Sequence, residues 1–156
     1  MRSNQISEIH LIVGARPNYI KANPVYQALA ELKRFDLKLI NTGQHYDHNM
    51  STLFFDELKM KSPDINLEVG SDSHGVQTAK IMERYEKILL DASPNLVIVF
   101  GDVNSTIACS IAAVKLHIPV AHVEAGLRSF DRSMPEEINR ILTDQISELL
   151  FITSPE

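Results

Sequence analysis

The sequence has no tryptophan, a single cysteine and no long hydrophobic run. Cys109 cannot form a disulfide within the chain, which favours a reducing compartment, and we expect a cytoplasmic protein. No stretch approaches the roughly 20 consecutive apolar residues that span a bilayer, and the polar start does not resemble a signal peptide. These features argue against a disulfide-rich secreted domain and against a membrane protein.

Basic charge is also scarce. The 156 residues include 15 Lys and Arg against 20 Asp and Glu, a formal net charge of −5. Binding to nucleic acid or to a membrane surface needs clustered basic residues, so we expect neither partner. The glycine-rich fingerprints of dinucleotide-binding proteins and of P-loop proteins are absent as well. The length fits one domain with its own hydrophobic core.

Short apolar runs alternate with segments of helical periodicity along the whole chain. The run at residues 95–100 has consecutive apolar positions from Leu96 to Phe100, which is typical of a strand that is buried on both faces in a parallel sheet. We expect a Rossmann-like, three-layer α/β fold with a doubly wound parallel sheet. The expected strands are residues 9–13, 37–42, 95–100, 118–123 and 150–153.

Helices are expected between these strands. The first begins near Pro24, with residues 17–23 as a separate short turn. The last is opened by Pro135 and is marked at helical spacing by Ile138, Leu142, Gln145 and Leu149. Residues 61–73 are rich in Pro, Gly, Asp and Ser and are expected to form a loop. The other helices carry apolar or buried faces at Met50, Phe54 and Leu58, at Thr78, Met82, Tyr85 and Leu89, and at Ile107, Ile111 and Val114.

Ligands of such sheets bind beyond the carboxyl ends of the strands, so the residues after each strand are candidates for function. Gly14 follows the first strand, and Arg16 and Lys21 come at the start of the next helix, where anions bind favourably. The alternative is an ordinary turn with solvated basic residues. After the second strand, Gln44 and His45 could donate hydrogen bonds to a sugar or phosphate. We expect no metal there, because the histidine spacing matches no standard zinc signature.

Three carboxylates follow later strands and are candidates for general acid–base chemistry. Asp102 could instead be a helix N-cap, and Glu124 could simply pair with Arg128. Glu136 stands at capping-box spacing from Ser133. Three carboxylates beside two cations suit acid–base chemistry on an anionic substrate.

Five motifs, in this order and spacing, resemble the N-terminal half of the non-hydrolysing UDP-N-acetylglucosamine 2-epimerases. The resemblance covers essentially the whole chain. The motifs are Gly14-Ala15-Arg16-Pro17 with Lys21, Thr42-Gly43-Gln44-His45, Phe100-Gly101-Asp102, His122-Val123-Glu124-Ala125-Gly126-Leu127-Arg128 and Pro135-Glu136-Glu137-Ile138-Asn139-Arg140.

The resemblance implies one half of a two-domain, glycosyltransferase-B-like enzyme that interconverts UDP-N-acetylglucosamine and UDP-N-acetylmannosamine. The family eliminates UDP and adds it back after inversion at carbon 2, without a metal or other cofactor. By motif, the acid–base carboxylates would be Asp102, Glu124 and Glu136, and the cations facing the substrate would be Arg16 and Lys21. Gln44 and His45 match a second, regulatory nucleotide-sugar site. Family members are homodimers.

Family members are longer than this chain and carry a second, UDP-binding domain. We therefore expect residues 1–156 to be the N-terminal domain, which folds but does not catalyse epimerisation by itself. Two other interpretations remain open at the level of sequence. The chain could be a non-catalytic nucleotide-sugar-binding module, or half of a glycosyltransferase-B enzyme.

Overall fold

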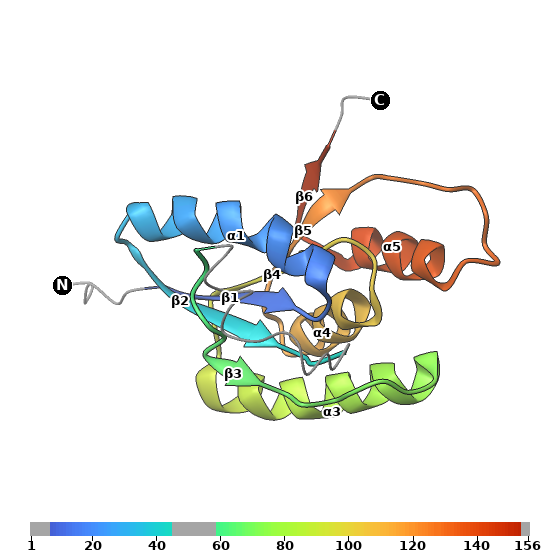
Figure 1. Ribbon diagram of the computed structural model, residues 1–156, viewed down its shortest axis with the longest axis horizontal. Coiled ribbons are helices and arrows are strands. Elements are labelled where there is room, and N and C mark those ends of the chain that lie inside the picture. The colour runs from blue at the N-terminus through green and yellow to red at the C-terminus, as the bar shows by residue number, and fades with distance from the viewer. Residues whose placement is uncertain (1–6, 45–58, 154–156) are drawn as a thin grey trace.

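The computed structural model describes residues 7–44 and 59–153, and within them one parallel sheet forms the centre of the molecule (Figure 1). All of its paired strands run parallel. Every strand expected from the sequence is present, and each end lies within two residues of its expected position. The strands are β1 (Ser7–Val13), β2 (Phe35–Asn41), β3 (Ile65–Asn66), β4 (Leu96–Phe100), β5 (Val120–Ala125) and β6 (Leu149–Ile152).

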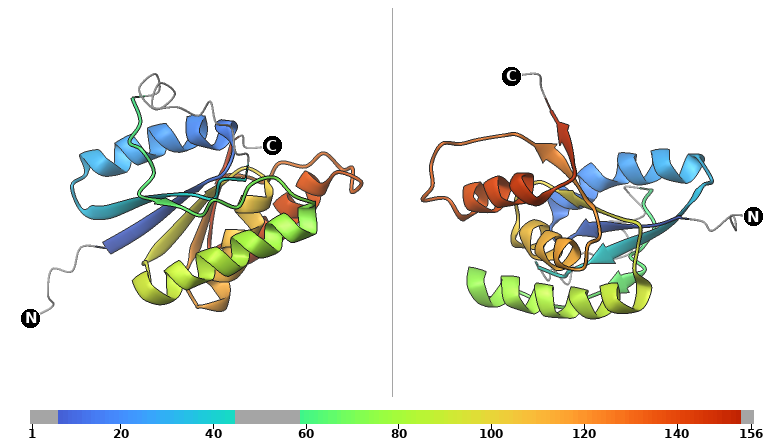
Figure 2. Two further views of the ribbon diagram at one scale, coloured as in Figure 1. Left: turned by 60° about the horizontal axis from the view of Figure 1, so that its bottom comes forward. Right: turned by 180° about the vertical axis from the view of Figure 1, so that it is seen from behind.

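Helices cover both faces of the sheet, which confirms the three-layer prediction (Figures 1 and 2). One face carries α1 (Arg16–Glu31), and the other carries α3 (His74–Ala92) and α4 (Asn104–Lys115). The last helix, α5 (Pro135–Ile146), packs against α4 and β5. No helix in the described part of the chain is long and apolar enough to cross a membrane.

The strand order is β3-β2-β1-β4-β5-β6, the order of a doubly wound Rossmann-type sheet. The winding direction reverses between β1 and β4, so the chain leaves these two strands toward opposite faces of the sheet. A crevice opens at such a reversal, beyond the carboxyl ends of the strands. The fold therefore places the turns after β1, β4 and β5 at the expected ligand-binding edge.

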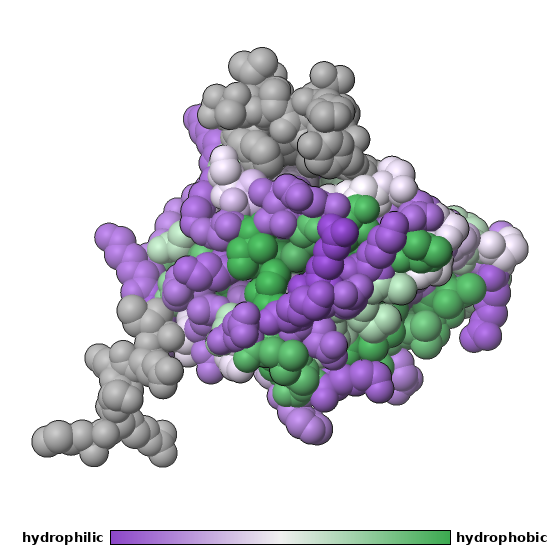
Figure 3. Space-filling view, turned by 90° about the horizontal axis from the view of Figure 1, so that it is seen from below, coloured by the Kyte–Doolittle hydropathy of each residue, from purple (hydrophilic) through white to green (hydrophobic). Residues whose placement is uncertain are grey.

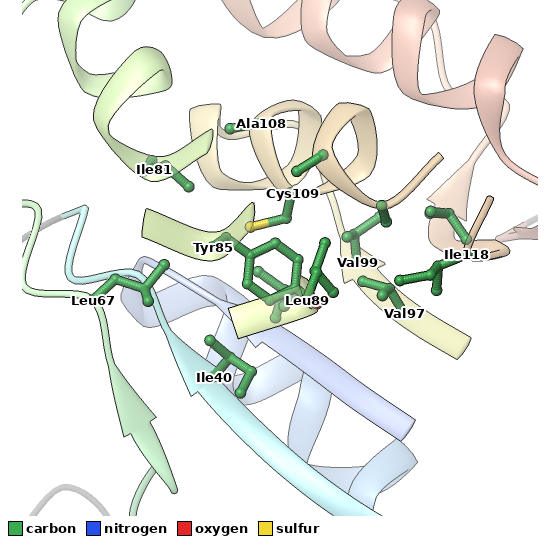
Figure 4. Packing of buried hydrophobic residues seen from close by; sticks show 14 of the residues in the cluster. Ile40, Leu67, Ile81, Tyr85, Leu89, Val97, Val99, Ala108, Cys109 and Ile118 are labelled. Carbon is green, nitrogen blue, oxygen red and sulfur yellow. The ribbon is translucent and has the colours of Figure 1, made fainter. Parts of the chain in front are cut away.

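Two apolar clusters hold the layers together. The cluster under α3 and α4 contains Tyr85, Leu89 and Cys109 packed on Val97 and Val99 (Figure 4). The cluster under α1 includes Tyr19 and Phe100. The outer surface on the α3 side is largely hydrophilic with scattered hydrophobic patches (Figure 3), as expected for an amphipathic helix that faces solvent.

The start of the first helix differs from the prediction. α1 begins at Arg16, and Pro24 lies inside it, so residues 17–23 are not a separate turn. Pro17 occupies the first turn, where its missing N–H costs nothing. Burial of Tyr19 and Ala22 against the sheet offsets the hydrogen bond that Pro24 cannot donate.

A loop and a helix were predicted between β2 and α3. The expected loop at residues 61–73 contains the short strand β3, which pairs with β2. The helix expected around Met50, Phe54 and Leu58 lies outside the described residues.

The edge of the sheet beyond β5 is apolar and open to solvent. All four residues of β6 are exposed. On α5, Ile138 and Leu142 are 47% and 46% exposed, although their spacing suggested a buried face. The buried residues of this helix are instead Glu137 and Thr143.

A buried histidine in β1 makes the stability of the chain sensitive to acid. His10 is 1% exposed, and its ring contacts Tyr85 Oη at 3.0 Å and Glu8 at 2.8 Å. Burial lowers the pKa of His10 and outweighs the opposing effect of Glu8. The folded state therefore disfavours the charged ring, so stability is retained above the unfolded-state pKa of about 6.5 and falls as the pH drops below it.

We expect His10→Gln to flatten this acid dependence. Urea unfolding at pH 7.5 and pH 5.5 would measure it for the parent chain and for the variant. An unchanged difference between the two pH values in the variant would contradict the assignment.

Candidate functional site

The turns after β1 and β4 are joined by a buried asparagine. Asn18, in the first turn of α1, is 2% exposed. Its Oδ1 accepts the Ala15 N–H at 3.1 Å, and its Nδ2 donates to the Phe100 carbonyl at 3.0 Å. One side chain thus fixes the start of α1 against the end of β4. This holds the two sides of the crevice together.

Glu124 lies on a β-bulge near the end of β5. The register with β6 shifts between Val123 and Ala125, and the φ angle of Glu124 is +76°. A non-glycine residue in this region carries strain of about 1–3 kcal/mol, and bulges commonly redirect a side chain beside an active site. Here the Glu124 carboxylate forms an ion pair with Lys21 from α1. The bulge thus brings a carboxylate of the sheet together with a cation from the helix α1 that covers one face of the sheet.

Gly101 leaves room for that ion pair. A Cβ at Gly101 would lie 3.3 Å from Glu124 Oε2 and 3.4 Å from Lys21 Nζ, and the φ angle of Gly101 is +65°. Both the space and the backbone conformation favour glycine. The turn after β4 therefore passes directly beside the charged pair.

Asp102 comes next and pairs with Arg140, which was not among the predicted site residues. Arg140 of α5 donates to Asp102 Oδ2 from Nη2 and to Glu137 Oε2 from Nη1, the latter at 2.7 Å. Asn139 donates to the Asp102 carbonyl at 2.9 Å. Asp102 is not the N-cap of α4, because that helix has Val103 in the N-cap position. Asn139 and Arg140 end the motif that begins at Pro135, and this motif was the signal in the sequence for both residues.

The second glutamate of α5 has a structural role. Glu137 is 1% exposed and accepts the Ser129 and Phe130 backbone N–H groups at 3.0 and 3.1 Å. The pKa of Glu137 is held below its usual range, although burial alone would raise it. The largest cause is the hydrogen bond from the Ser129 N–H, and the Phe130 N–H and the charge of Arg140 add to it. Glu137 thus fixes the loop between β5 and α5.

Glu136 faces a different hollow from the charged pairs. It lines a cavity of about 290 Å³ together with Gln44, His74, Gln77 and Asn104. The predicted capping box with Ser133 is wrong, because Met134 is the N-cap of α5 and Ser133 Oγ donates to Asp131. Asn104 also contacts Asn139, the partner of the Asp102 carbonyl, so this cavity borders the Asp102 turn.

Gln44 uses its side-chain carbonyl within the fold. Its Oε1 accepts hydrogen bonds from the backbone N–H and the hydroxyl of Ser105 at 2.9 and 2.6 Å. The backbone carbonyl of Gln44 accepts a hydrogen bond from Gln77 Nε2. The side chain fixes the start of α4 and lines the cavity beside Glu136. His45 lies outside the described residues.

The remaining predicted residues lie at the same edge of the sheet. Arg16 is exposed as the first residue of α1. Arg128 pairs with Asp144 at 2.6 Å, so the alternative in which Arg128 neutralises Glu124 is wrong. The structure brings Lys21, Glu124, Gly101 and Asp102 together and places Glu136 along the same rim.

The described residues include no cluster of metal-ligating side chains, and their one cysteine is buried. Within residues 7–44 and 59–153, no group of three or more His, Cys, Asp or Glu side chains is arranged to hold a metal ion. Burial raises the pKa of the Cys109 thiol well above its usual value, which makes it a poor nucleophile. The chemistry available at the rim is proton transfer by carboxylates beside fixed cations.

Comparison with known protein families agrees with this geometry. The family model described as UDP-N-acetylglucosamine 2-epimerase matches residues 27–156. A UDP-N-acetylglucosamine 2-epimerase homolog of Methanococcus maripaludis is 56% identical over 92% of this chain and 40% of its own length. A UDP-2,3-diacetamido-2,3-dideoxy-D-glucuronate 2-epimerase of Pseudomonas aeruginosa is 49% identical over 92% of this chain and 41% of its own length. The chain thus spans about two fifths of the length of these relatives.

Solved structures show the same fold. The crystal structure of Methanocaldococcus jannaschii UDP-GlcNAc 2-epimerase in complex with UDP-GlcNAc and UDP is 51% identical, with a TM-score of 0.88 over 93% of this chain and 40% of that one. The Neisseria meningitidis enzyme bound to UDP-GlcNAc is 33% identical, with a TM-score of 0.85 over 93% of this chain and 39% of that one. Since the family model matches most of the sequence, this chain belongs to the UDP-N-acetylglucosamine 2-epimerase family.

Proposed function

We propose that residues 1–156 form the N-terminal domain of a glycosyltransferase-B-like enzyme that interconverts UDP-N-acetylglucosamine and UDP-N-acetylmannosamine. A second, UDP-binding domain outside this chain would close the site. The observation that carries the proposal is the placement of the Lys21–Glu124 pair beside the Asp102–Arg140 pair at the reversal of the sheet. The high similarity to named 2-epimerases supports it.

The proposed chemistry follows from what inversion at carbon 2 requires. Elimination of UDP needs a base that takes the carbon-2 proton, and re-addition needs an acid that returns a proton to the opposite face. Asp102, Glu124 and Glu136 are the proposed carboxylates for these transfers. Arg16 and Lys21 are proposed to stabilise the diphosphate as it leaves. No step calls for a cofactor.

Regulation and assembly extend the proposal. Gln44 and His45 are proposed to contact a second nucleotide sugar, since Gln44 lines the cavity beside Glu136. The whole enzyme is proposed to be a cytoplasmic homodimer.

A chimera tests the proposed reaction. It joins this chain to the part of the M. jannaschii epimerase that follows the matched region, a relative that is 51% identical. In heavy water, the chimera is expected to convert UDP-N-acetylglucosamine to the manno epimer with deuterium at carbon 2, whereas the 156-residue chain forms none. Turnover without label would contradict the proton-transfer mechanism, and epimer formation by the chain alone would contradict the two-domain proposal.

The substrate needs its own comparison, because the P. aeruginosa relative is named for a different nucleotide sugar at nearly the same identity. The same assay is therefore run with UDP-2,3-diacetamido-2,3-dideoxy-D-glucuronate. Faster turnover of that sugar than of UDP-N-acetylglucosamine would replace the proposed substrate while leaving the reaction type intact.

A further inference from the structure

A fully buried histidine lies beneath the candidate site. His122 of β5 is 0% exposed, and both of its ring nitrogens face oxygen atoms. Its Nε2 lies 2.7 Å from the Gly101 carbonyl oxygen, and its Nδ1 lies 2.6 Å from Asp144 Oδ1. The imidazole ring therefore bridges the Gly101 carbonyl and the Asp144 carboxylate, both of which accept hydrogen bonds.

Asp144 of α5 receives that donation together with two others. Its Oδ2 accepts the Gly126 N–H at 3.1 Å and Arg128 Nη1 at 2.6 Å. Burial favours a raised pKa, but the hydrogen bonds from Arg128, Gly126 and His122 outweigh it and hold the pKa of Asp144 below its usual range. The Asp144 carboxylate, with 8% of its side chain exposed, is thus fixed between the His122 ring and the Arg128 guanidinium.

These contacts join the two turns that carry the candidate carboxylates. Gly101, which His122 holds, immediately precedes Asp102. Gly126, which Asp144 holds, comes two residues after Glu124. Gly101, Glu124 and Gly126 all have positive φ angles, so the two turns adopt conformations that depend on their surroundings.

We infer that Asp144 is a positioning residue that, through His122 and Gly126, sets the backbone of both Asp102 and Glu124 without touching either side chain. The catalytic part of this inference rests on the proposed function, because it assumes that these two carboxylates transfer protons. The structural part is independent of any activity.

Nuclear magnetic resonance of the 156-residue chain tests the structural part. Asp144→Asn keeps the shape of the side chain and removes its charge. The backbone amide signals of both Asp102 and Glu124 are expected to shift in this variant. Shifts confined to residues 126–128 and α5 would overturn the inference.

A matched control is Asp64→Asn. The Asp64 carboxylate also accepts a backbone N–H, that of Leu39 at 2.9 Å, and pairs with a cation, Lys61, but at the other side of the sheet. It is expected to leave the signals of Asp102 and Glu124 in place, and equal shifts in both variants would overturn the inference. If Asp144→Asn does not fold, Asp144→Glu, which keeps the charge but moves the carboxylate, is measured in its place. Shifts of both the Asp102 and Glu124 amide signals support the inference, and unchanged signals overturn it.

Kinetics of the chimera test the catalytic part. Asp144→Asn is expected to lower kcat by ~10²-fold with little change in KM. Misplaced catalytic groups slow the chemical step, whereas the binding of the substrate is largely retained. If the parent chimera turns over, an Asp144→Asn chimera with the same kcat would overturn the positioning role. A parent chimera with no turnover would count against the proposed function alone, because the amide shifts still decide whether Asp144 sets the two turns.

Discussion

Replacing Glu124 by glutamine in the chimera is expected to lower the epimerisation rate by ~10²–10⁴-fold, the usual contribution of a positioned acid or base. The amide keeps the shape of the carboxylate on its bulge but cannot take a proton from carbon 2. Affinity for the nucleotide sugar should change little, because Lys21 loses its ion-pair partner yet stays beside the site. Deuterium exchange at carbon 2 measures the rate, and calorimetry measures the affinity.

Glu8→Gln is the matched control for this substitution. The Glu8 side chain is 26% exposed, as is that of Glu124, and it also contacts a basic side chain, His10. Glu8 lies at the amino end of β1, away from the rim. Its variant should turn over at the parent rate. A Glu124→Gln chimera that retains more than a tenth of the parent rate would remove Glu124 from the proton transfer.

Gly14→Ala is expected to lower the free energy of unfolding by about 1–3 kcal/mol, the usual cost of overfilling a packed site. A Cβ at Gly14 would lie 2.1 Å from Ser105 Oγ, 2.9 Å from Ser105 Cβ and 2.5 Å from Thr42 Oγ1. The Ser105 side chain cannot turn away without losing the hydrogen bonds of its hydroxyl with Gln44 Oε1 and Thr42 Oγ1. Relief therefore requires the start of α4 to move away from β1. Urea unfolding monitored by circular dichroism measures the loss.

Gly75→Ala has the opposite expected sign and serves as the control. Gly75 lies in the first turn of α3, and nothing lies within 4 Å of a Cβ placed there. Alanine at such a position stabilises by about 0.4–1 kcal/mol, because it restricts the unfolded chain. A Gly14→Ala variant as stable as the parent would show that the turn after β1 has more room than the structure gives it.

The parallel sheet could be predicted because its signal is local. The run from Leu96 to Phe100 is apolar on every residue, and glycine follows both β1 and β4 closely. The start of α1 was missed because Pro24 is a strong local signal for the first turn of a helix, and only packing against the sheet overrides it. The exposure of Ile138 and Leu142 was missed because periodicity shows which residues share a face but not what covers that face.

The carboxylates of the candidate site were predicted, but the contacts that they make were not. The carboxylates follow strand ends, which the sequence reveals, but their partners come from elsewhere in the chain. No pattern near Glu124 indicates that its backbone adopts a positive φ angle or that Lys21, and not Arg128, is its counterion. Asp144 looks like any polar position on a surface helix until the fold brings it under β5.

The exposed edge formed by β6 bears on how the protein behaves in solution. Its four apolar residues, Leu149 to Ile152, pair with β5 on one side, and within the described residues no strand pairs with the other side. An open, apolar edge strand is a template on which a second chain can add its own strand, the first step of edge-to-edge aggregation. Protein concentration is therefore a variable that every stability measurement on this chain must hold fixed.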